Sequence, residues 1–274
     1  MTLLRHTLCL LATTALSVLV AMSGARLQAA ETAGQTPADQ PPLIAPTPYE
    51  AGYQARARGL STDAYRNLVQ TADNVDNIDN VYQLRHGLSL RVLGANLITV
   101  AETSHFYWLD SGAVPVSYAF EQSGLRRRQE RISFDWDAQR ATVTRDDRET
   151  VTDISDGLLD NLSFTAQMSS QLHARPALLT PGTTLEYPIL DGTEPEIQQY
   201  RVTARETVDT LTGPLDTVLI ERIREPDSDR STRIWLAVEH EFVLARLEQI
   251  EDGDTTELLL SSLTMGDTRL QSAE

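Results

Sequence analysis

The sequence is poor in residues that build covalent or basic sites, with one cysteine, Cys9, and no lysine. Cys9 lies within an apolar stretch near the beginning of the chain, so everything after that stretch lacks a thiol. This absence excludes disulfide bonds, zinc–thiolate centres and cysteine nucleophiles from the rest of the protein. A lipoprotein signal is also excluded, because it needs a cysteine directly after the apolar stretch and Cys9 lies inside it.

Basic charge is scarce as well, since 23 arginines stand against 39 acidic residues and the net charge is −16. Residues 1–30 carry Arg5 and Arg26 but no acidic residue, so the chain without them has a net charge of about −18. Nucleic acid binding depends on neutralising phosphates, and anionic lipid surfaces attract basic proteins. The charge therefore predicts no nucleic acid partner, and it argues against anionic lipid head groups as the main attraction.

The first thirty residues have the pattern of a signal peptide. Arg5 and His6 precede an apolar stretch from Leu8 to Val20, which is broken by Thr13, Thr14 and Ser17. Its length suits the apolar part of a signal, whereas a membrane-spanning helix needs roughly 20 apolar residues. We predict a signal peptide over residues 1–30 that is cleaved between about Ala25 and Ala30. The expected location is the periplasm of a Gram-negative cell, with no transmembrane anchor after cleavage.

The remaining chain divides into a short leader, one domain and a tail. Residues 31–48 are rich in proline, alanine, threonine and glutamine, which predicts a disordered linker. Residues 49–264 are long enough to bury a core without covalent staples, and we predict a single β-rich domain there. Residues 265–274 are predicted to be a flexible tail.

Alternation of apolar and polar residues is the dominant signal, and it is typical of half-buried β-strands. Residues 114–120 and 132–136 alternate clearly, with aromatic side chains in phase, and turn residues separate such segments. Roughly a dozen strands are expected. They lie near 49–58, 61–72, 80–92, 96–107, 114–120, 132–136, 141–143, 197–208, 215–224, 230–238, 242–251 and 256–263.

Three strand centres, at 218–220, 234–238 and 258–260, are apolar on both faces, so they need a partner on each side. The segment from about Asp156 to His173 has apolar residues near helical spacing, with Ser155 as a candidate cap and Pro176 beyond its end. We therefore predict a mainly β fold, in which a strongly curved antiparallel sheet or open barrel of roughly a dozen strands surrounds one long covering helix.

No catalytic or metal constellation stands out. No histidine outside the signal lies within two to four residues of another, so no short metal motif forms. Ser104 and His105 are adjacent in a predicted strand and therefore point to opposite faces. Ser163 lacks the glycines of a hydrolase elbow. The repeat Asp73–Asn80 lacks the glycine and spacing of a calcium loop and is interpreted as a polar hairpin tip. We predict no catalytic residue, no metal and no cofactor.

Aromatic residues are the candidate ligand contacts. A barrel of this size can enclose one small ligand, and large rings could line a cavity for an acyl chain. The alternative is that these rings fill the core. The candidates are Phe106, Trp108, Tyr118, Phe134, Trp136 and Trp235.

Several segments in order resemble a known family, the bacterial domain of unknown function numbered 3108. In the first half these segments are Ala101–Phe106, Val114–Tyr118 and Phe134–Trp136, and in the second half Gly157–Ser163, Trp235–Ala237 and Leu258–Leu260. The resemblance spans about Tyr49 to Leu263. It implies an exported protein, mostly of Gram-negative bacteria, and it implies no particular reaction.

Three functions remain open at this point. The first is non-enzymatic binding of a hydrophobic ligand or an envelope partner by the curved sheet. The second is a structural or interaction protein with a filled core that docks on another envelope protein. The third is a hydrolase of envelope polymers, which predicts a cleft with converging carboxylates. The expected partners are a lipid or an envelope protein, and the oligomeric state is left open.

Overall fold

The computed structural model describes residues 41–71, 81–92, 95–124 and 127–272. The predicted signal peptide, the first ten residues of the predicted linker and the predicted hairpin tip lie outside the described residues. Within the described ranges, no helix has the length and apolar character needed to cross a membrane.

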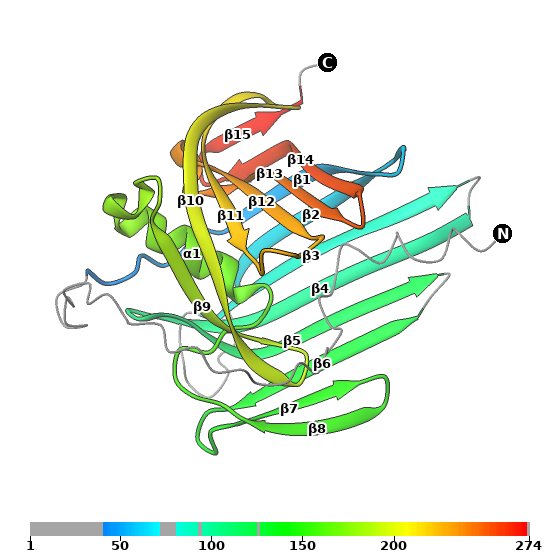
Figure 1. The fold of residues 1–274 in the computed structure, drawn as a ribbon, viewed down its shortest axis with the longest axis vertical. Coiled ribbons are helices and arrows are strands. Elements are labelled where there is room, and N and C mark those ends of the chain that lie inside the picture. Colours follow the sequence, from blue (N-terminus) through cyan, green and yellow to red (C-terminus); the bar gives the residue numbers. More distant parts are fainter. Residues whose placement is uncertain (1–40, 72–80, 93–94, 125–126, 273–274) are drawn as a thin grey trace.

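In the part of the chain that the structure describes, fifteen β-strands form one antiparallel sheet, and a single α-helix packs against it (Figure 1). The strands that precede the helix are β1 (Tyr49–Ala57), β2 (Leu60–Thr71), β3 (Val81–Val92), β4 (Ala95–Leu109), β5 (Gly112–Gly124), β6 (Arg128–Asp135), β7 (Arg140–Arg145) and β8 (Arg148–Asp153). After α1 (Ser163–Ala174) follow β9 (Thr184–Asp191), β10 (Glu194–Thr210), β11 (Gly213–Ile223), β12 (Ser231–Ala237), β13 (Val243–Glu251), β14 (Asp254–Met265) and β15 (Thr268–Gln271). Two short 3₁₀ turns, η2 (Pro176–Leu179) and η3 (Val238–His240), complete the elements.

The sheet consists of two meanders joined in its middle. Strands β1 to β8 pair in sequence order, as do β9 to β14, and the two series meet where β1 pairs with β14. This central pairing brings Ala55 opposite Leu258. β15 pairs with the end of β14. Every pairing except the central one therefore joins strands that are neighbours in the chain.

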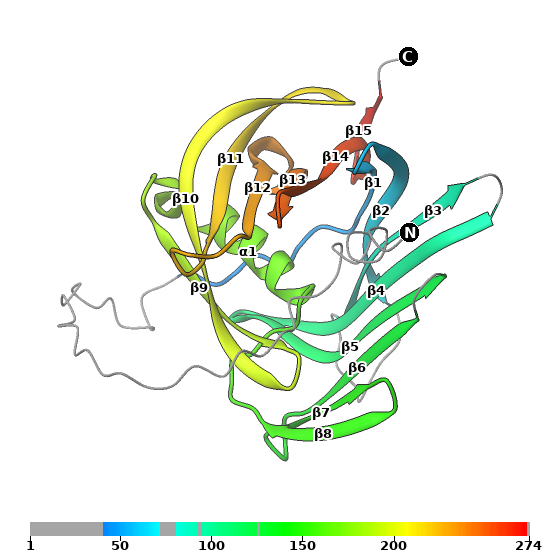
Figure 2. The same ribbon diagram turned by 45° about the vertical axis from the view of Figure 1, so that its right-hand side comes forward.

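The sheet curves strongly and wraps around α1, which lies on its concave side (Figures 1 and 2). The described pairings leave β8 and β9 at the two ends of the sheet order, so the barrel is open there. Leu159 partly bridges this opening, because its amide donates to Pro188 and its carbonyl accepts from Leu190, both at 2.9 Å. These observations confirm the predicted open barrel around one helix, although the strands are more numerous than expected.

Alternation positions the core on the concave side. In β6, Glu130, Ile132 and Phe134 are buried, while Arg131 and Ser133 face solvent. The same period of two runs through β14, where Leu258 and Leu260 point inward. Inward residues from both meanders and from α1 form one continuous hydrophobic core. Only a curved sheet brings both ends of such a long strand series onto one core.

The helix is shorter than predicted. It begins at Ser163 rather than near Asp156, and Ser155 does not cap it. Leu159 instead pairs with β9, and buried Asp160 accepts hydrogen bonds from the amides of Leu162 and Ser163 at 2.8 and 2.9 Å. The apolar spacing of this segment reflects burial of an extended turn, which helical periodicity alone does not distinguish from a helix.

Three strands were missing from the prediction, two because their own sequences show little alternation, and β9 because a proline interrupts its alternating Leu185, Tyr187 and Ile189. β8 is almost entirely exposed, β9 contains Pro188, and β15 has only four residues. Such edge strands form because a neighbouring strand offers backbone partners. β15 also corrects the predicted flexible tail, since Leu270 pairs with Leu263 and packs against the core.

The end of the predicted linker is ordered. Leu43 is buried, and its amide donates to the carbonyl of Asp110 at 2.9 Å. Thr47 donates to the Glu241 carboxylate at 2.8 Å, and the Ile44 carbonyl accepts from Ser170 at 2.6 Å. The composition of residues 41–48 predicts disorder, but one apolar anchor and these polar contacts hold the segment against the domain.

Candidate functional site

A cavity of about 270 Å³ lies between α1 and the concave face of the sheet. Strands β2 to β5 form one wall, β10 to β14 form the other, and one side of α1 faces both. Most of the lining is apolar, and it includes Leu68, Phe164, Met168, Leu236, Phe242 and Leu258. Both meanders and the helix therefore contribute to the same cavity, which makes it the candidate functional site.

Hydrogen bonds fix α1 at this position. The Ser169 hydroxyl donates to the Phe242 carbonyl at 2.9 Å, and Gln167 accepts from the Ala113 amide at 3.0 Å. The Tyr187 hydroxyl donates to Gln171 at 2.6 Å. Because these contacts reach the β12–β13 connection, β5 and β9, the helix is a fixed wall of the cavity.

Three polar residues form a row across the floor of the cavity. Arg66 on β2 lies opposite His86 on β3, and His86 lies opposite Glu102 on β4. All three line the cavity, together with Tyr118 of β5. Residues that are directly opposite in neighbouring strands have side chains on the same face. The register therefore places two charged groups and an imidazole in an otherwise apolar interior.

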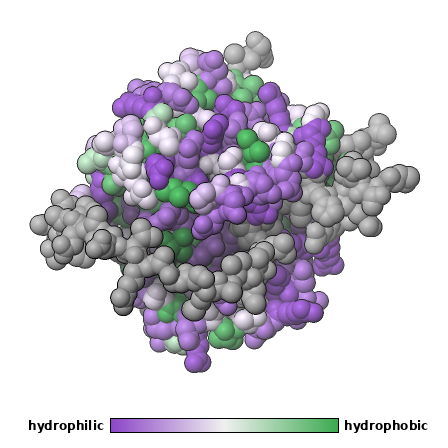
Figure 3. Space-filling model, in the orientation of Figure 1, coloured by the Kyte–Doolittle hydropathy of each residue, from purple (hydrophilic) through white to green (hydrophobic). Residues whose placement is uncertain are grey.

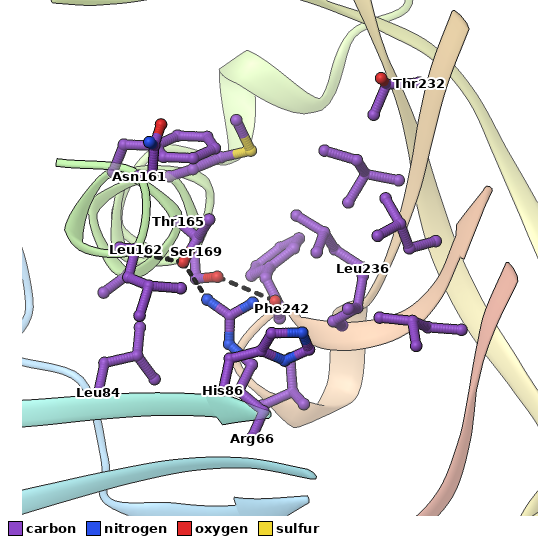
Figure 4. Close-up of a pocket in the computed structure, with 18 of the residues that line it drawn as sticks. Arg66, Leu84, His86, Asn161, Leu162, Thr165, Ser169, Thr232, Leu236 and Phe242 are labelled. Carbon is purple, nitrogen blue, oxygen red and sulfur yellow. Dashed lines mark hydrogen bonds between the residues drawn. The ribbon is translucent and has the colours of Figure 1, made fainter. Parts of the chain in front are cut away.

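Arg66 links this row to the helix. Its guanidinium donates to the hydroxyl of Thr165 on α1 and, at 3.1 Å, to the hydroxyl of Tyr49 (Figure 4). Figure 4 shows Arg66 reaching from the sheet toward α1, with His86 beside it. On the far side of the row, the Tyr118 hydroxyl donates to the Glu102 carboxylate at 2.9 Å.

Burial raises the pKa of Glu102 from 4.5 to about 7, although the Tyr118 hydrogen bond and the charge of Arg66 both act to lower it. Desolvation disfavours the charged carboxylate more than these two contacts favour it. Burial likewise lowers the pKa of His86 from 6.5 to about 4, and the nearby charge of Arg66 acts in the same direction. At neutral pH the imidazole is uncharged, while Glu102 titrates near neutrality.

This row can hold and exchange a proton. A carboxyl group with a raised pKa in a cavity occurs in general acids, and it also occurs where burial is purely structural. The other fully buried carboxylate of this region, Asp160, accepts from the Ser104 hydroxyl at 2.6 Å and from the start of α1. His105 contacts Gln83 and Ser117 on the outward face instead, as the predicted opposite orientation of Ser104 and His105 requires.

Of the six predicted aromatic contacts, Tyr118 lines the cavity. Phe106 and Trp108 pack with Tyr82, with ring centroids 5.8 to 6.5 Å apart, in the core beside it. Phe134 stacks on Trp136, whose indole donates to the Pro115 carbonyl at 2.6 Å. These four rings fill the core between neighbouring strands, as the alternative interpretation expected.

Trp235 lies on the opposite face of β12 from the cavity residue Leu236. The guanidinium of Arg246 stacks over its ring at 4.6 Å, and its indole donates to Glu206 at 2.6 Å. The outer covering of this doubly apolar strand is thus an arginine side chain, which shields the ring with its stem and guanidinium. No contact of Trp235 with the cavity supports a ligand role for it.

Arg66, His86 and Glu102 were missed because none of them is part of a recognisable sequence motif, and each lies on a different strand. The signal that identifies them is phase: His86 lies between Leu84 and Leu88 on the inward-facing set of β3. A polar residue in the apolar phase of a strand has to be buried. Among the described residues, no group of three metal-binding side chains comes together.

The outer surface contrasts with this interior. The face in Figure 3 is mostly hydrophilic, with apolar atoms in separate small areas. The large apolar side chains that are exposed lie on several different elements, including Leu109 on β4, Val151 on β8 and Ile197 on β10. Scattered single residues of this kind are normal for a protein surface and do not define a docking patch.

Fold and cavity define a class of protein: an open, barrel-like antiparallel sheet around one helix, with an apolar cavity between them. Its family follows from the sequence, since the profile of the protein family of unknown function DUF3108 matches residues 49–260. The chain belongs to this family, which confirms the resemblance drawn from the sequence. A search of curated protein sequences finds no significant match.

Three solved structures are similar in fold. A β-barrel-like protein of the domain of unknown function DUF1849 from Brucella abortus has a TM-score of 0.51 at 12% identity, over 81% of this chain and 99% of that chain. An exported protein described as having a YmcC-like fold, from Bacteroides fragilis, has a TM-score of 0.36 at 11% identity, over 82% and 99%. A protein described as a lipoprotein, from Parabacteroides distasonis, has a TM-score of 0.27 at 11% identity, over 82% and 100%. The first supports the barrel-like fold, and none of the three carries information about function.

Proposed function

We propose that this protein is a non-enzymatic binding protein of the cell envelope that holds a hydrophobic ligand in the cavity between α1 and the curved sheet. The observation that carries the proposal is the cavity itself, which is walled by apolar side chains from both meanders and the helix. Ligand sites of this kind are concave, mostly apolar and equipped with a few polar groups. The periplasmic location is supported by the signal peptide predicted from the sequence.

The size of the cavity indicates the size of the ligand. Its volume of about 270 Å³ is at the small end of ligand pockets, which span roughly 300 to 1,000 Å³. A single narrow chain suits this space better than a ligand with several chains. The fixed position of α1 also favours a preformed site over one that closes by a movement of the helix.

Filling the cavity with a large side chain is expected to abolish ligand binding. Ile234 of β12 lines the cavity and is half-buried, so the tryptophan of Ile234→Trp has room to enter it. We expect this variant to bind the uncharged probe N-phenyl-1-naphthylamine at least tenfold more weakly than the unchanged protein. Fluorescence titration measures the affinity, and native mass spectrometry of the periplasmic protein shows whether a co-purified lipid is lost.

The matched control is Leu219→Trp, which adds the same side chain to the outer face of the neighbouring strand. Leu219 lies opposite Trp235, on the side of the sheet away from the cavity. It is expected to bind the probe as tightly as the unchanged protein does. Equal binding by Ile234→Trp, or no binding by the unchanged protein, would remove the support for a ligand cavity.

A further inference from the structure

The polarity of the cavity changes along its strands. The inward-facing residues of β11 run from Val218 and Ile220 to Arg222, and Arg224 follows directly after the strand. On the antiparallel neighbour β12, the inward-facing residues Leu236, Ile234 and Thr232 follow one another in the same direction along the cavity. Arg230 lies just before this strand. The wall formed by β11 and β12 is therefore apolar at one end, while three arginines line its other end.

The charges of these arginines are only partly balanced. Arg222 pairs with Glu196 at 3.0 Å, and Arg230 pairs with Glu251. No carboxylate of the described residues pairs with Arg224, which donates instead to the hydroxyl of Thr232 at 3.3 Å. Its Nε atom is buried and has no hydrogen-bond partner within the described part of the chain. A buried donor without a partner is uncommon, and an anion beside Arg224 would supply an acceptor for it.

The surroundings of Arg224 support the same conclusion. Burial lowers the pKa of Arg224 to about 10, and the positive charges of Arg222 and Arg230 act in the same direction. An anion at this point would relieve the repulsion among the three guanidinium groups and accept from the free Nε. Guanidinium groups bind carboxylates and phosphates with paired hydrogen bonds.

We propose that Arg224, flanked by Arg222 and Arg230, binds the anionic head group of a single-chain amphiphile whose apolar chain occupies the cavity. This inference rests on the proposed function and names the ligand class. The overall negative charge of the protein disfavours attraction to an anionic surface, but it does not oppose one anion held at a local excess of positive charge. The apolar chain supplies most of the binding, and the arginines supply selectivity.

The test compares two probes that share a chain and differ in head group: 11-(dansylamino)undecanoate and its uncharged methyl ester. The unchanged protein is expected to bind the acid about tenfold more tightly than the ester. Arg224→Gln is expected to weaken binding of the acid by about tenfold and to leave that of the ester within twofold. Retained ester binding shows that the variant is folded. Arg148→Gln, which removes an exposed arginine on β8, is the control and should change neither affinity.

The outcomes separate the two proposals. Equal affinity of the unchanged protein for acid and ester, or an Arg224→Gln variant that binds the acid normally, would overturn the head-group assignment while cavity binding stands. Binding of neither probe would overturn the proposed function as well. If inorganic phosphate alone bound as tightly as the acid, the arginines would form an anion site that does not need the apolar chain. This result would also overturn the proposal that the ligand is an amphiphile.

Discussion

Replacing Asp160 with alanine is expected to lower the free energy of unfolding by about 4 kcal/mol, since three buried donors lose one carboxyl acceptor. Its carboxylate accepts from the Ser104 hydroxyl at 2.6 Å and from the amides of Leu162 and Ser163 at 2.8 and 2.9 Å. Burial raises the pKa of Asp160, so removing the carboxylate also relieves a desolvation penalty. The unpaired donors outweigh that relief, because two of them are backbone groups that cannot turn away.

Chemical denaturation at neutral pH measures this loss. Asp160→Asn is expected to cost about half as much, because one amide oxygen still accepts from the two backbone groups and the Ser104 hydroxyl can rotate to accept. Asp156→Ala, only four residues earlier but exposed, is the control and should leave stability nearly unchanged. If Asp160→Ala were as stable as this control, the contacts that start α1 would not matter for folding.

Glu102→Gln is expected to remove a pH dependence from the stability of the protein. The pKa of Glu102 is raised from 4.5 to about 7 in the folded state, so the folded protein holds this proton more tightly than the unfolded chain does. The contribution of the protonated group is fully present below pH 4.5 and is lost as the pH rises through about 7. Each pKa unit corresponds to about 1.4 kcal/mol, so the full loss is about 3 to 4 kcal/mol.

The variant cannot ionise at this position, and its amide oxygen still accepts from Tyr118. Relative to the unchanged protein, its free energy of unfolding should therefore increase by about 3 kcal/mol between pH 4.5 and pH 8. His86, whose pKa is lowered to about 4, contributes in the opposite sense as the pH falls from 6.5 to 4. That contribution is common to both proteins and cancels in the difference. Glu149→Gln, at an exposed position of β8, is the control. Parallel stability curves for Glu102→Gln and the unchanged protein would contradict the prediction.

Alternation within single segments was enough to predict most of the strands, and strand centres that are apolar on both faces predicted the curved sheet around a helix. In segments such as the one containing Ile132 and Phe134, the sequence alone indicates both a strand and the face that is buried. The prediction failed where pairing with a distant segment determines the local structure. Leu158 and Leu159 fit helical spacing, yet the backbone of Leu159 pairs with β9. The polar strand β8 is a strand because β7 offers it hydrogen-bonding groups.

The site was harder to predict than the fold because it depends on register. Arg66, His86 and Glu102 come from three strands, and nothing in one strand shows which residue of the next lies opposite. The six aromatics were chosen by residue type, and only Tyr118 lines the cavity. Arg224 is in phase with the inward-facing Ile220 and Arg222, but nothing in that segment shows that Arg230 lies beside it. The residues that line the cavity together are determined by which positions lie opposite one another in neighbouring strands. The candidates had been chosen by residue type, which does not contain this information.

The pairing of β1 with β14 has a consequence for how the molecule is assembled. Synthesis delivers β1 to β8 first, and these strands can zip locally as successive hairpins. Until β14 has been synthesised, β1 has an edge with unpaired backbone groups and an exposed apolar face. A nascent chain at this stage is open to strand addition by other chains. Truncation within β14 would leave β1 without its partner, so completion of the sheet depends on β14.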